Sequence, residues 1–512
     1  MRRLLLILLV VLFPVSLPAQ PIGKEFLPPE HWAYRALARF ETLGLVHLPG
    51  ERPYTRDDVV SYASSVVDNI RSNERIVSAR DRFELNRLEE EFLNPSSQTD
   101  PAVRFDKPLI YASDKPLHLE FDIDLSLQPT KPLDDTRWWW FLRSSPEIRL
   151  HFSRWLTWEV RYRLVYGPER DDRVDDSKPS PRERSFKGLT SVYERSYLNF
   201  QWKRLTFYAG REYIDWGSRI SENLSISSTA GSLDKIGGRI GFLNMIFSFF
   251  HSTLSTDTDR HLAGHRLELR FNRLRIGLTE TVIYFGRSFE PSYLLPLSSY
   301  YANQFNEGRD DNVIWEVDAQ YAWDHVTLFG NFLVDDFQFE REGGAPDKIA
   351  FDLGARVALV SPIAVTARVF YRYVDIYTYT HEDSLNYYIT GNGDPNVDLP
   401  LGAFDGPDTD RLAASLAVYP VPSLTTTFLF SHVRRGEGND WRTHVPPMDP
   451  NPSFPSGVVE KTLTFGLRLL WELPGNSRTG FDTRIAHVSN KANQSGVDDW
   501  GTSAFFFFTW DF

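Results

Sequence analysis

The sequence contains no cysteine, which excludes a disulfide framework, thiolate metal sites and cysteine nucleophiles. Beyond the first twenty residues it also lacks any run approaching the ~18–20 apolar residues that a membrane helix needs, and its mean hydropathy is −0.34. Positive charge is in the minority, since 56 Lys and Arg face 68 Asp and Glu, for a net charge of −12. Proteins that coat nucleic acids neutralise phosphates with Lys and Arg, so we expect no nucleic-acid partner.

The first residues have the three parts of a secretory signal peptide. Arg2 and Arg3 precede the apolar run from Leu4 to Phe13, and Ala19 offers a small residue for cleavage. A helix of about ten apolar residues spans only about half of the hydrocarbon core of a bilayer. We therefore expect residues 1–19 to be a cleaved signal peptide and the mature chain to be exported.

The next region, residues 20–100, has helical apolar spacing. Ala33, Leu37 and Phe40 fall on one helical face, and Gly44 follows as the residue beyond the helix end. This pattern predicts a first short helix.

Two further helices are predicted in the same region. Thr55 and Asp58 form an Asp variant of the capping box that opens the second helix. The third helix is expected from about Ser78 to Phe92. Three short helices make a small bundle.

Three motifs stand within this bundle: His31-Trp32-Ala33, Leu43-Gly44-Leu45 and Arg52-Pro53-Tyr54-Thr55-Arg56-Asp57-Asp58. Together they resemble one S-layer-homology repeat, a family whose members grip cell-wall polymers. The resemblance implies peptidoglycan as a partner, bound through Arg56. The alternative is that the helical region serves as a plug or spacer.

From residue 117 the apolar period changes to two. Leu117 to Leu127 alternates without a break between apolar and polar residues, as a strand with one apolar face does. The same alternation predicts eighteen strands, at about 117–127, 147–153, 157–166, 194–202, 205–211, 236–242, 245–253, 265–271, 274–285, 312–321, 326–335, 349–358, 364–375, 411–419, 424–434, 460–470, 480–488 and 504–512.

Loop lengths favour a membrane barrel over a soluble sandwich. Connections after even-numbered strands are short, such as Asn272-Arg273, whereas connections after odd-numbered strands run from about eleven to about thirty-five residues. We therefore predict an all-β transmembrane barrel of about 18 antiparallel strands over residues 117–512, with a small periplasmic α-helical region before it. Sixteen strands would also fit, because boundaries from sequence carry errors of about two to four residues.

Aromatic residues support an outer-membrane barrel of a Gram-negative bacterium. They make up 14% of the chain, which suits the girdles where a barrel wall meets lipid and lipopolysaccharide. Trp138-Trp139-Trp140 fits such a girdle. In the last predicted strand, Phe506, Phe508, Trp510 and Phe512 alternate to the end of the chain. Outer-membrane barrels commonly close on such a strand, so we predict that Phe508, Trp510 and Phe512 form the signal for the barrel assembly machinery.

Charged residues of both signs fall on faces that we expect to line the lumen. The residues proposed as lumen ion pairs or structural partners are Glu120, Arg161, Arg211, Glu268, Glu280 and Arg356. Cross-strand salt bridges that stiffen a closed or narrow barrel are one interpretation. An aqueous permeation path is the other.

The longest loop, between about Asp375 and Asp410, is rich in rings beside polar groups. Sugar rings stack their C–H faces on aromatic side chains and bond to carboxylates, so we predict that this loop binds polysaccharide through Tyr377, Tyr379, Tyr387, Tyr388 and Asp394. The alternative is a self-packed loop that caps the barrel.

We find none of the common enzyme and metal-binding motifs in the sequence. It has no Walker loop, no His-Glu-x-x-His and no Gly-x-Ser-x-Gly. The spacing of Asp405, Asp408 and Asp410 does not match an EF-hand. We predict no metal, no cofactor and no enzymatic activity.

Several segments of the barrel carry a family resemblance. They are Gly210-Arg211-Glu212-Tyr213-Ile214-Asp215-Trp216-Gly217, His265-Arg266-Leu267-Glu268-Leu269-Arg270, Gly277-Leu278-Thr279-Glu280-Thr281, Tyr293-Leu294-Leu295-Pro296-Leu297, Asp311-Asn312 and Val334-Asp335-Asp336. Together they resemble the Wzi-type capsule assembly proteins. The resemblance implies an outer-membrane protein that binds or assembles capsular or other extracellular polysaccharide at the cell surface, without a catalytic step. An outer-membrane porin or specific channel for small solutes is the alternative.

The assembly signal gives a first testable prediction. Deleting Phe512 should slow insertion of the barrel into the outer membrane, because it removes the aromatic end of the closing strand. Pulse-chase labelling of membrane insertion measures this rate, and an unchanged rate would argue against the signal.

Overall fold

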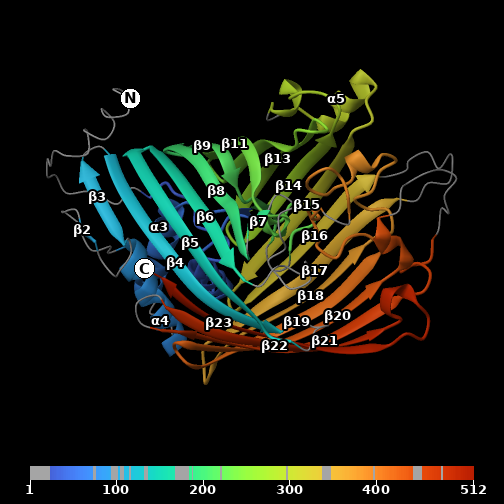
Figure 1. Cartoon of the computed structure of the whole chain (residues 1–512). Coiled ribbons are helices and arrows are strands. Elements are labelled where there is room, and N and C mark those ends of the chain that lie inside the picture. The colour runs from blue at the N-terminus through green and yellow to red at the C-terminus, as the bar shows by residue number, and fades with distance from the viewer. Residues whose placement is uncertain are drawn as a thin grey trace.

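The structure is a computed structural model that describes residues 23–72, 77–93, 102–103, 109–114, 117–131, 137–167, 184–186, 188–218, 222–295, 298–336, 347–395, 398–441, 452–473 and 477–511. It is a closed barrel of 18 antiparallel strands, with a small group of helices at one end (Figure 1). The predicted signal peptide, residues 1–19, lies outside the described residues.

The barrel strands agree in number and order with the predicted ones. They are β4 (Leu117–Lys131), β5 (Trp139–Ser153), β6 (Leu156–Tyr166), β8 (Leu189–Trp202), β9 (Leu205–Glu212), β11 (Leu233–Phe242), β12 (Met245–Ser255), β13 (Arg260–Phe271), β14 (Leu274–Tyr284), β15 (Asn312–Trp323), β16 (Val326–Asp336), β17 (Lys348–Leu359), β18 (Ala364–Val374), β19 (Thr409–Val421), β20 (Leu424–Arg435), β21 (Glu460–Glu472), β22 (Arg478–Ser489) and β23 (Asp499–Asp511).

The last strand closes the barrel on the first. β23 pairs antiparallel with β4, with Trp510 opposite Leu125 and Ala504 opposite Lys131. Eighteen strands, and not sixteen, therefore make up the barrel.

Short strands accompany the barrel. β2 (Ala102–Val103) pairs with β3 (Ile110–Asp114), which pairs with the start of β4, and β7 (Arg184–Phe186) pairs with β8. β1 (Glu51–Arg52) and β10 (Asp215–Trp216) form a separate two-stranded sheet.

Short and long connections alternate, as expected. The short turns at one end place Lys203, Leu243 and Asn272 at positive φ, the backbone form that tight hairpins require. One long loop was wrongly predicted. The connection between β12 and β13 is only residues 256–259, because both strands extend further than their apolar alternation indicates.

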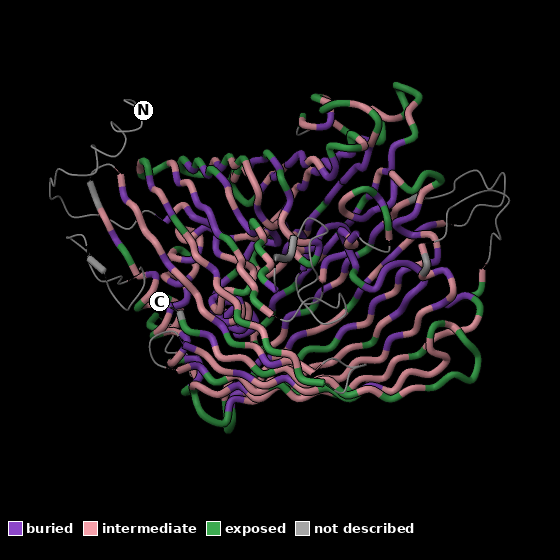
Figure 2. The backbone as a smooth tube through the Cα atoms, viewed as in Figure 1, coloured by how far each residue is buried: buried purple, intermediate pink, exposed green. Residues whose placement is uncertain are grey.

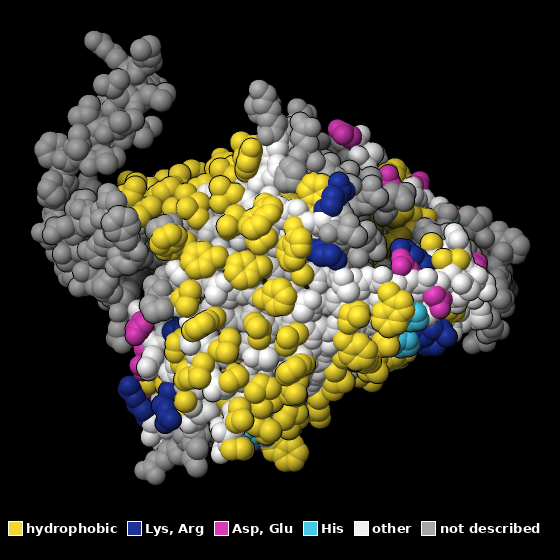
Figure 3. All heavy atoms as spheres, turned by 60° about the horizontal axis from the view of Figure 1, so that its bottom comes forward, with side chains coloured by type: hydrophobic (Ala, Val, Ile, Leu, Met, Phe, Trp, Pro, Cys, Tyr) yellow, Lys and Arg dark blue, Asp and Glu magenta, His cyan; other side chains and the backbone are white. Residues whose placement is uncertain are grey.

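The outer wall is apolar. Hydrophobic side chains cover it (Figure 3), and exposed Leu, Ile and Phe side chains alternate with buried polar ones along the strands. Exposed tryptophans lie at both ends: Trp155, Trp202 and Trp323 beside short turns, and Trp138, Trp140 and Trp500 beside long loops. This is the pattern of a lipid-facing wall between two aromatic girdles. Among the described residues, no helix is long and apolar enough to span a membrane.

The helical region consists of α2 (Trp32–Thr42), α3 (Arg56–Ser72), α4 (Ala79–Leu88) and the π-helical turn η2 (Glu89–Leu93). Thr55 and Asp58 bond to each other's backbone N–H at 3.0 and 3.2 Å, as the predicted capping box requires. Gly44 has the left-handed φ of 71° expected beyond a helix end.

These helices lie against the inner wall of the barrel and plug its short-turn end. Arg39 on α2 donates to the carbonyl oxygens of Val365 and Leu359. On the opposite side, Arg239 of β11 bonds to Asp58 on α3 at 2.9 Å. The alternative to peptidoglycan binding is that the helical region serves as a plug or a spacer. Its position inside the barrel is that of a plug. We call residues 23–93, as far as they are described, the plug.

One carboxylate ties the plug to the wall with three ion pairs. Glu472 at the end of β21 receives Arg35 at 2.7 Å, Arg80 at 2.7 Å and Arg87 at 2.5 Å, and its side chain is only 6% exposed. Breaking a buried ion pair costs about 3–5 kcal/mol, because a buried charge is left without its partner.

Replacing Glu472→Gln should therefore loosen the plug. We expect amide hydrogens of α2 and α4 to exchange with deuterium at least tenfold faster, measured by mass spectrometry on the purified barrel. Asp324→Asn is a matched control, since Asp324 pairs with Arg273 at 3.6 Å in an exposed turn at the same end and such pairs contribute little. Equal exchange in the Glu472→Gln variant and the wild type would contradict this role.

Candidate functional site

Two connections from the long-loop end fold into the lumen. They are the described residues 213–218 and 222–232, between β9 and β11, and 375–395 and 398–408, between β18 and β19. Their apolar side chains share one buried cluster with inward-facing residues of the strands; its members include Trp216, Leu224, Ile226, Tyr379, Tyr388, Leu401, Phe250, Ile314 and Leu333. The lumen is therefore occupied from both ends, by the plug and by these loops.

One arginine holds the longer of these loops. Arg260 on β13 is fully buried. Its guanidinium donates to the carbonyl oxygens of Ile389, Thr390 and Gly391, each at 2.9 Å, and also to those of Leu385 and Tyr387. Five carbonyl groups of this loop thus bond to a single side chain.

A buried aspartate joins this loop to its neighbour between β20 and β21. Asp408 accepts hydrogen bonds from the backbone N–H of Gly438 at 2.8 Å and of Ser456 at 3.0 Å. The Ser456 hydroxyl donates to the same carboxylate at 2.5 Å. The described parts of the two loops are therefore joined at the barrel mouth.

The tyrosines predicted to bind polysaccharide lie mostly inside this packing. Tyr379, Tyr387 and Tyr388 are 1%, 4% and 0% exposed. Tyr379 donates to the carbonyl oxygen of Leu224 at 2.7 Å, and burial raises the pKa of its hydroxyl well above the usual value. Tyr377 is half-buried and Asp394 is exposed.

The binding role of Tyr379, Tyr387 and Tyr388 is thus corrected, because a buried ring has no face for a sugar. These three residues instead belong to a loop that packs on itself and on the barrel, as the alternative prediction states.

Other side chains, of the two loops and of the adjoining ends of β19 and β20, do reach the surface. Phe404 is 37% exposed, and Trp441 is half-buried, 6.4 Å from Tyr379 between ring centroids. Arg411 and Arg435 share the buried carboxylate of Asp405 and keep part of their guanidinium groups exposed. We define the mouth surface as six residues: Tyr377, Asp394, Phe404, Arg411, Arg435 and Trp441. The sequence does not single out the last four of these residues. They are isolated along the chain, whereas the prediction depended on rings clustered in one loop.

Four of the predicted lumen residues face inward and are paired. Glu120 bonds to Arg149 at 3.2 Å, Arg161 to Glu30 at 3.2 Å, and Arg356 to Glu41 at 3.2 Å, while Glu268 accepts the backbone N–H of Gly50 at 2.6 Å. Glu30, Glu41 and Gly50 belong to the plug. Arg161, Arg356 and Glu268 therefore bond to the plug, the part of the same chain that fills the short-turn end of the barrel.

Arg211 and Glu280 do not face the lumen, and their predicted position is corrected. Arg211 pairs with Asp234 on the face that it shares with the exposed Phe207 and Ile236. Glu280 shares its face with the exposed Leu278. Strict alternation along β9 and β14 places both outward, so counting from inward neighbours would have found this.

Glu280 instead anchors a segment on the outside of the barrel. Its carboxylate accepts the backbone N–H groups of Tyr300 and Tyr301, both at 3.1 Å, at the start of α5 (Tyr300–Glu307). His265 and Trp315 on the neighbouring strands also reach it, at 3.0 and 2.9 Å. The connection between β14 and β15 is therefore clamped against the outer wall.

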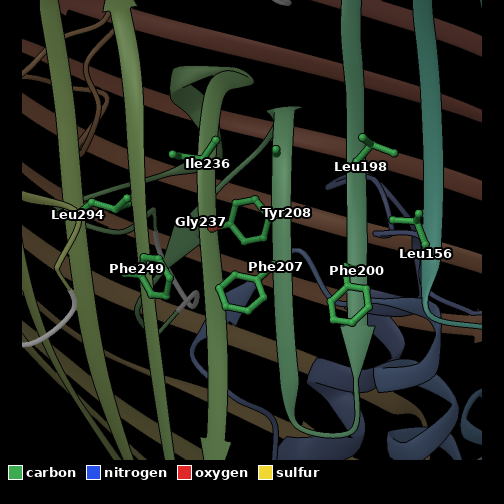
Figure 4. A pocket seen from close by; sticks show the side chains of 10 residues that line it. Leu156, Leu198, Phe200, Phe207, Tyr208, Ile236, Gly237, Phe249 and Leu294 are labelled. Carbon is green, nitrogen blue, oxygen red and sulfur yellow. The ribbon is translucent and has the colours of Figure 1, made fainter. Parts of the chain in front are cut away.

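An apolar groove of about 350 Å³ also lies on this wall, lined by residues such as Leu198, Phe207, Ile236 and Phe249 (Figure 4). Because Leu198, Phe207 and Ile236 are exposed on the lipid-facing wall, the groove belongs to the lipid contact and not to the mouth surface.

The closing strand carries Phe506, Phe508 and Trp510 on its outward face. Trp510 is 52% exposed, and its ring centroid lies 6.1 Å from that of Phe508. Phe512 lies outside the described residues.

Asp405, Asp408 and Asp410 are bonded to arginines or to N–H and hydroxyl groups. In the portion of the chain that the structure describes, no three His, Asp or Glu residues are grouped to hold a metal ion.

A closed barrel of this size, with an apolar outer wall and two aromatic girdles, defines the class: a β-barrel protein of the outer membrane of a Gram-negative bacterium. The family model described as capsule assembly protein Wzi matches residues 142–499, so the chain belongs to the Wzi capsule assembly family.

The fold is similar to that of solved barrels. Wzi from Escherichia coli, described as a carbohydrate-binding β-barrel involved in group 1 capsule assembly, is 11% identical with a TM-score of 0.59, over 95% of this chain and 99% of that chain. OccD3 (OpdP) from Pseudomonas aeruginosa is 12% identical with a TM-score of 0.47, over 81% of this chain and 95% of that chain. No curated protein matches the chain.

The role of Arg260 gives a prediction for the loops. Arg260→Met should release residues 385–391, because hydrogen bonds to a charged group contribute about 1.5–3 kcal/mol each. Deuterium exchange of these amides should accelerate more than tenfold. Arg204→Met, in an exposed short turn, should leave them unchanged. Slow exchange at 385–391 in the Arg260→Met variant would show that the loop is held by other contacts.

Proposed function

We propose that this protein binds exported capsular or other extracellular polysaccharide at the cell surface through the mouth surface, without a catalytic step. The observation that carries the proposal is the fixed, partly aromatic mouth above a lumen that the chain itself occupies. Rings stack on sugar C–H faces, and the neighbouring guanidinium and carboxylate groups bond to hydroxyls. The chain's membership of the capsule assembly family supports this role.

The alternative, a porin or specific channel, is less favoured. A porin needs a continuous water path. Here the plug pairs with wall residues on opposite sides of the barrel, and two loops from the other end pack into the lumen. The carbohydrate binding ascribed to the Escherichia coli barrel, which this chain covers almost completely, also favours a binding protein.

Other partners follow from the same proposal. Residues 1–19 direct export as a cleaved signal peptide, the barrel assembly machinery inserts the chain, and lipid and lipopolysaccharide surround its outer wall. Peptidoglycan binding through the S-layer-homology-like motifs stays a separate prediction. Arg56 is already bonded to Glu25 at 2.6 Å and its side chain is 22% exposed, which favours the plug role for these motifs.

Removing the mouth rings tests the proposal. The double variant Phe404→Ala and Trp441→Ala should retain at least fivefold less capsular polysaccharide from the source strain when immobilised, since aromatic contacts contribute about 0.5–1.5 kcal/mol each. The control Tyr301→Ala and Phe305→Ala removes two exposed rings from α5, on the outer wall, and should retain polysaccharide normally.

Tyr388→Phe is a second control. It removes only the hydroxyl that donates to Thr281 at 2.8 Å, so retention should not change. Wild-type retention by a correctly folded Phe404→Ala and Trp441→Ala barrel would exclude the mouth surface as the binding site.

A further inference from the structure

The inner wall of the barrel has two unlike parts. Between β8 and β18 several inward-facing arginines are buried: Arg195, Arg266 and Arg372 each expose only 1% of their side chain. From β19 to β23 the strands are mostly half-buried or exposed (Figure 2). There the side chains of Arg468 on β21 and Arg484 on β22 are 49% and 43% exposed.

Both of these arginines face the lumen. Along β21 and β22 they alternate with Phe465 and Ile485, which are exposed on the lipid-facing wall. Arg468 also shares its face with Glu472, the residue that binds the plug inside the barrel. Because the two guanidinium groups face inward and still keep almost half of their surface, solvent reaches this part of the lumen.

The two arginines share one counter-ion. The Asp482 carboxylate receives Arg468 at 2.6 Å and Arg484 at 3.1 Å. Arg468 and Asp482 lie directly opposite each other on the paired strands. Arg368 on β18, exposed on the same inner face, is close enough for its charge to act on that of Arg468. Asp482 is therefore shared by two arginines, and Arg368, which also feels the charge of Glu222, adds a third positive charge nearby.

Aromatic rings complete this part of the wall. Phe505 lies opposite Asp482 on the neighbouring strand, and Phe507 follows two residues on, 5.7 Å away between ring centroids. Both face inward, because Phe506 between them is exposed on the outer wall. Both are only half-buried, unlike the core rings near the plug. We call Arg368, Arg468, Asp482, Arg484 and Phe505 the arginine niche.

We propose that the arginine niche binds the carboxylate group of an acidic saccharide. A planar guanidinium pairs with a carboxylate through two parallel hydrogen bonds. Among the described residues, Arg468 and Arg484 both bond to Asp482 through Nε and Nη2, so the Nη1 group of each can reach such a ligand. The Phe505 ring beside it offers a face for the sugar ring. The proposal rests on the proposed function and adds to it the class of saccharide, one that carries carboxylates.

Two tetrasaccharides of equal length serve as probes in a binding experiment on the full-length barrel in detergent. Tetragalacturonate carries a carboxylate on each ring, whereas maltotetraose is neutral. Isothermal titration calorimetry should show at least tenfold tighter binding of tetragalacturonate to the wild type. This comparison needs no variant, and equal affinity for the two probes would overturn the proposal.

A variant locates the binding. Arg468→Gln with Arg484→Gln should lower the affinity for tetragalacturonate at least tenfold and leave that for maltotetraose unchanged. The control Arg204→Gln with Arg434→Gln removes the same charge from an exposed turn and from the outer wall, and should bind as the wild type. Heat-modifiable mobility on gels reports correct folding. Undiminished binding by the folded niche variant would overturn the proposal.

The two proposals fail differently. Should the mouth variant retain polysaccharide normally while the niche variant loses tetragalacturonate, the mouth assignment is wrong and the niche stands. Should the mouth variant fail to retain polysaccharide while the niche variant binds tetragalacturonate as the wild type does, the niche is wrong and the mouth stands.

Discussion

A charged side chain that points into a barrel must be hydrated or paired, and the rest of this structure depends on how that requirement is met. The inner wall carries ions of both signs, and over much of its circumference their partners are residues of the plug. Arg161, Arg239, Arg356 and Glu472 come from four different strands and each bonds to the plug. Removing the plug would take these partners from Arg239, Arg356 and Glu472, whereas Arg161 would keep Asp124, Glu147 and Glu194 on the wall.

The same requirement acts at the other end of the barrel. There the loop between β18 and β19 enters the lumen, and five of its carbonyl groups accept hydrogen bonds from Arg260. Asp408 then fixes the neighbouring loop. A mouth built in this way is rigid before any ligand arrives, and a rigid surface loses less conformational entropy on binding. On β21 and β22, away from the end of β21 that binds the plug, Arg468 and Arg484 keep 49% and 43% of their side chains exposed, which is why we place a ligand there.

Much of the fold could be predicted from the sequence, because its signals are local. Strand alternation, short turns and the Thr55–Asp58 capping box each depend on residues a few positions apart. The aromatic closing strand is also a local pattern. The fold prediction failed where a strand continued past its alternation, as β12 and β13 do on either side of residues 256–259.

The candidate site could be predicted less well, because it depends on contacts between distant segments. A loop with rings beside polar groups has the same composition whether it binds a sugar or packs on itself, and the burial of Tyr379 and Tyr388 is decided by Leu224 and Thr281, more than 100 residues away. The helices and the lumen ions were both predicted. Their pairing could not be predicted, because it depends on contacts between residues far apart in the sequence, such as the ion pair of Glu41 and Arg356.

Single-channel conductance in planar bilayers tests the central claim, that the lumen is occupied by the chain itself and the protein acts as a surface binding barrel. We expect the purified, refolded protein to insert into the bilayer without steady conductance of the size seen for porins. A large and stable conductance in the wild-type protein would contradict it.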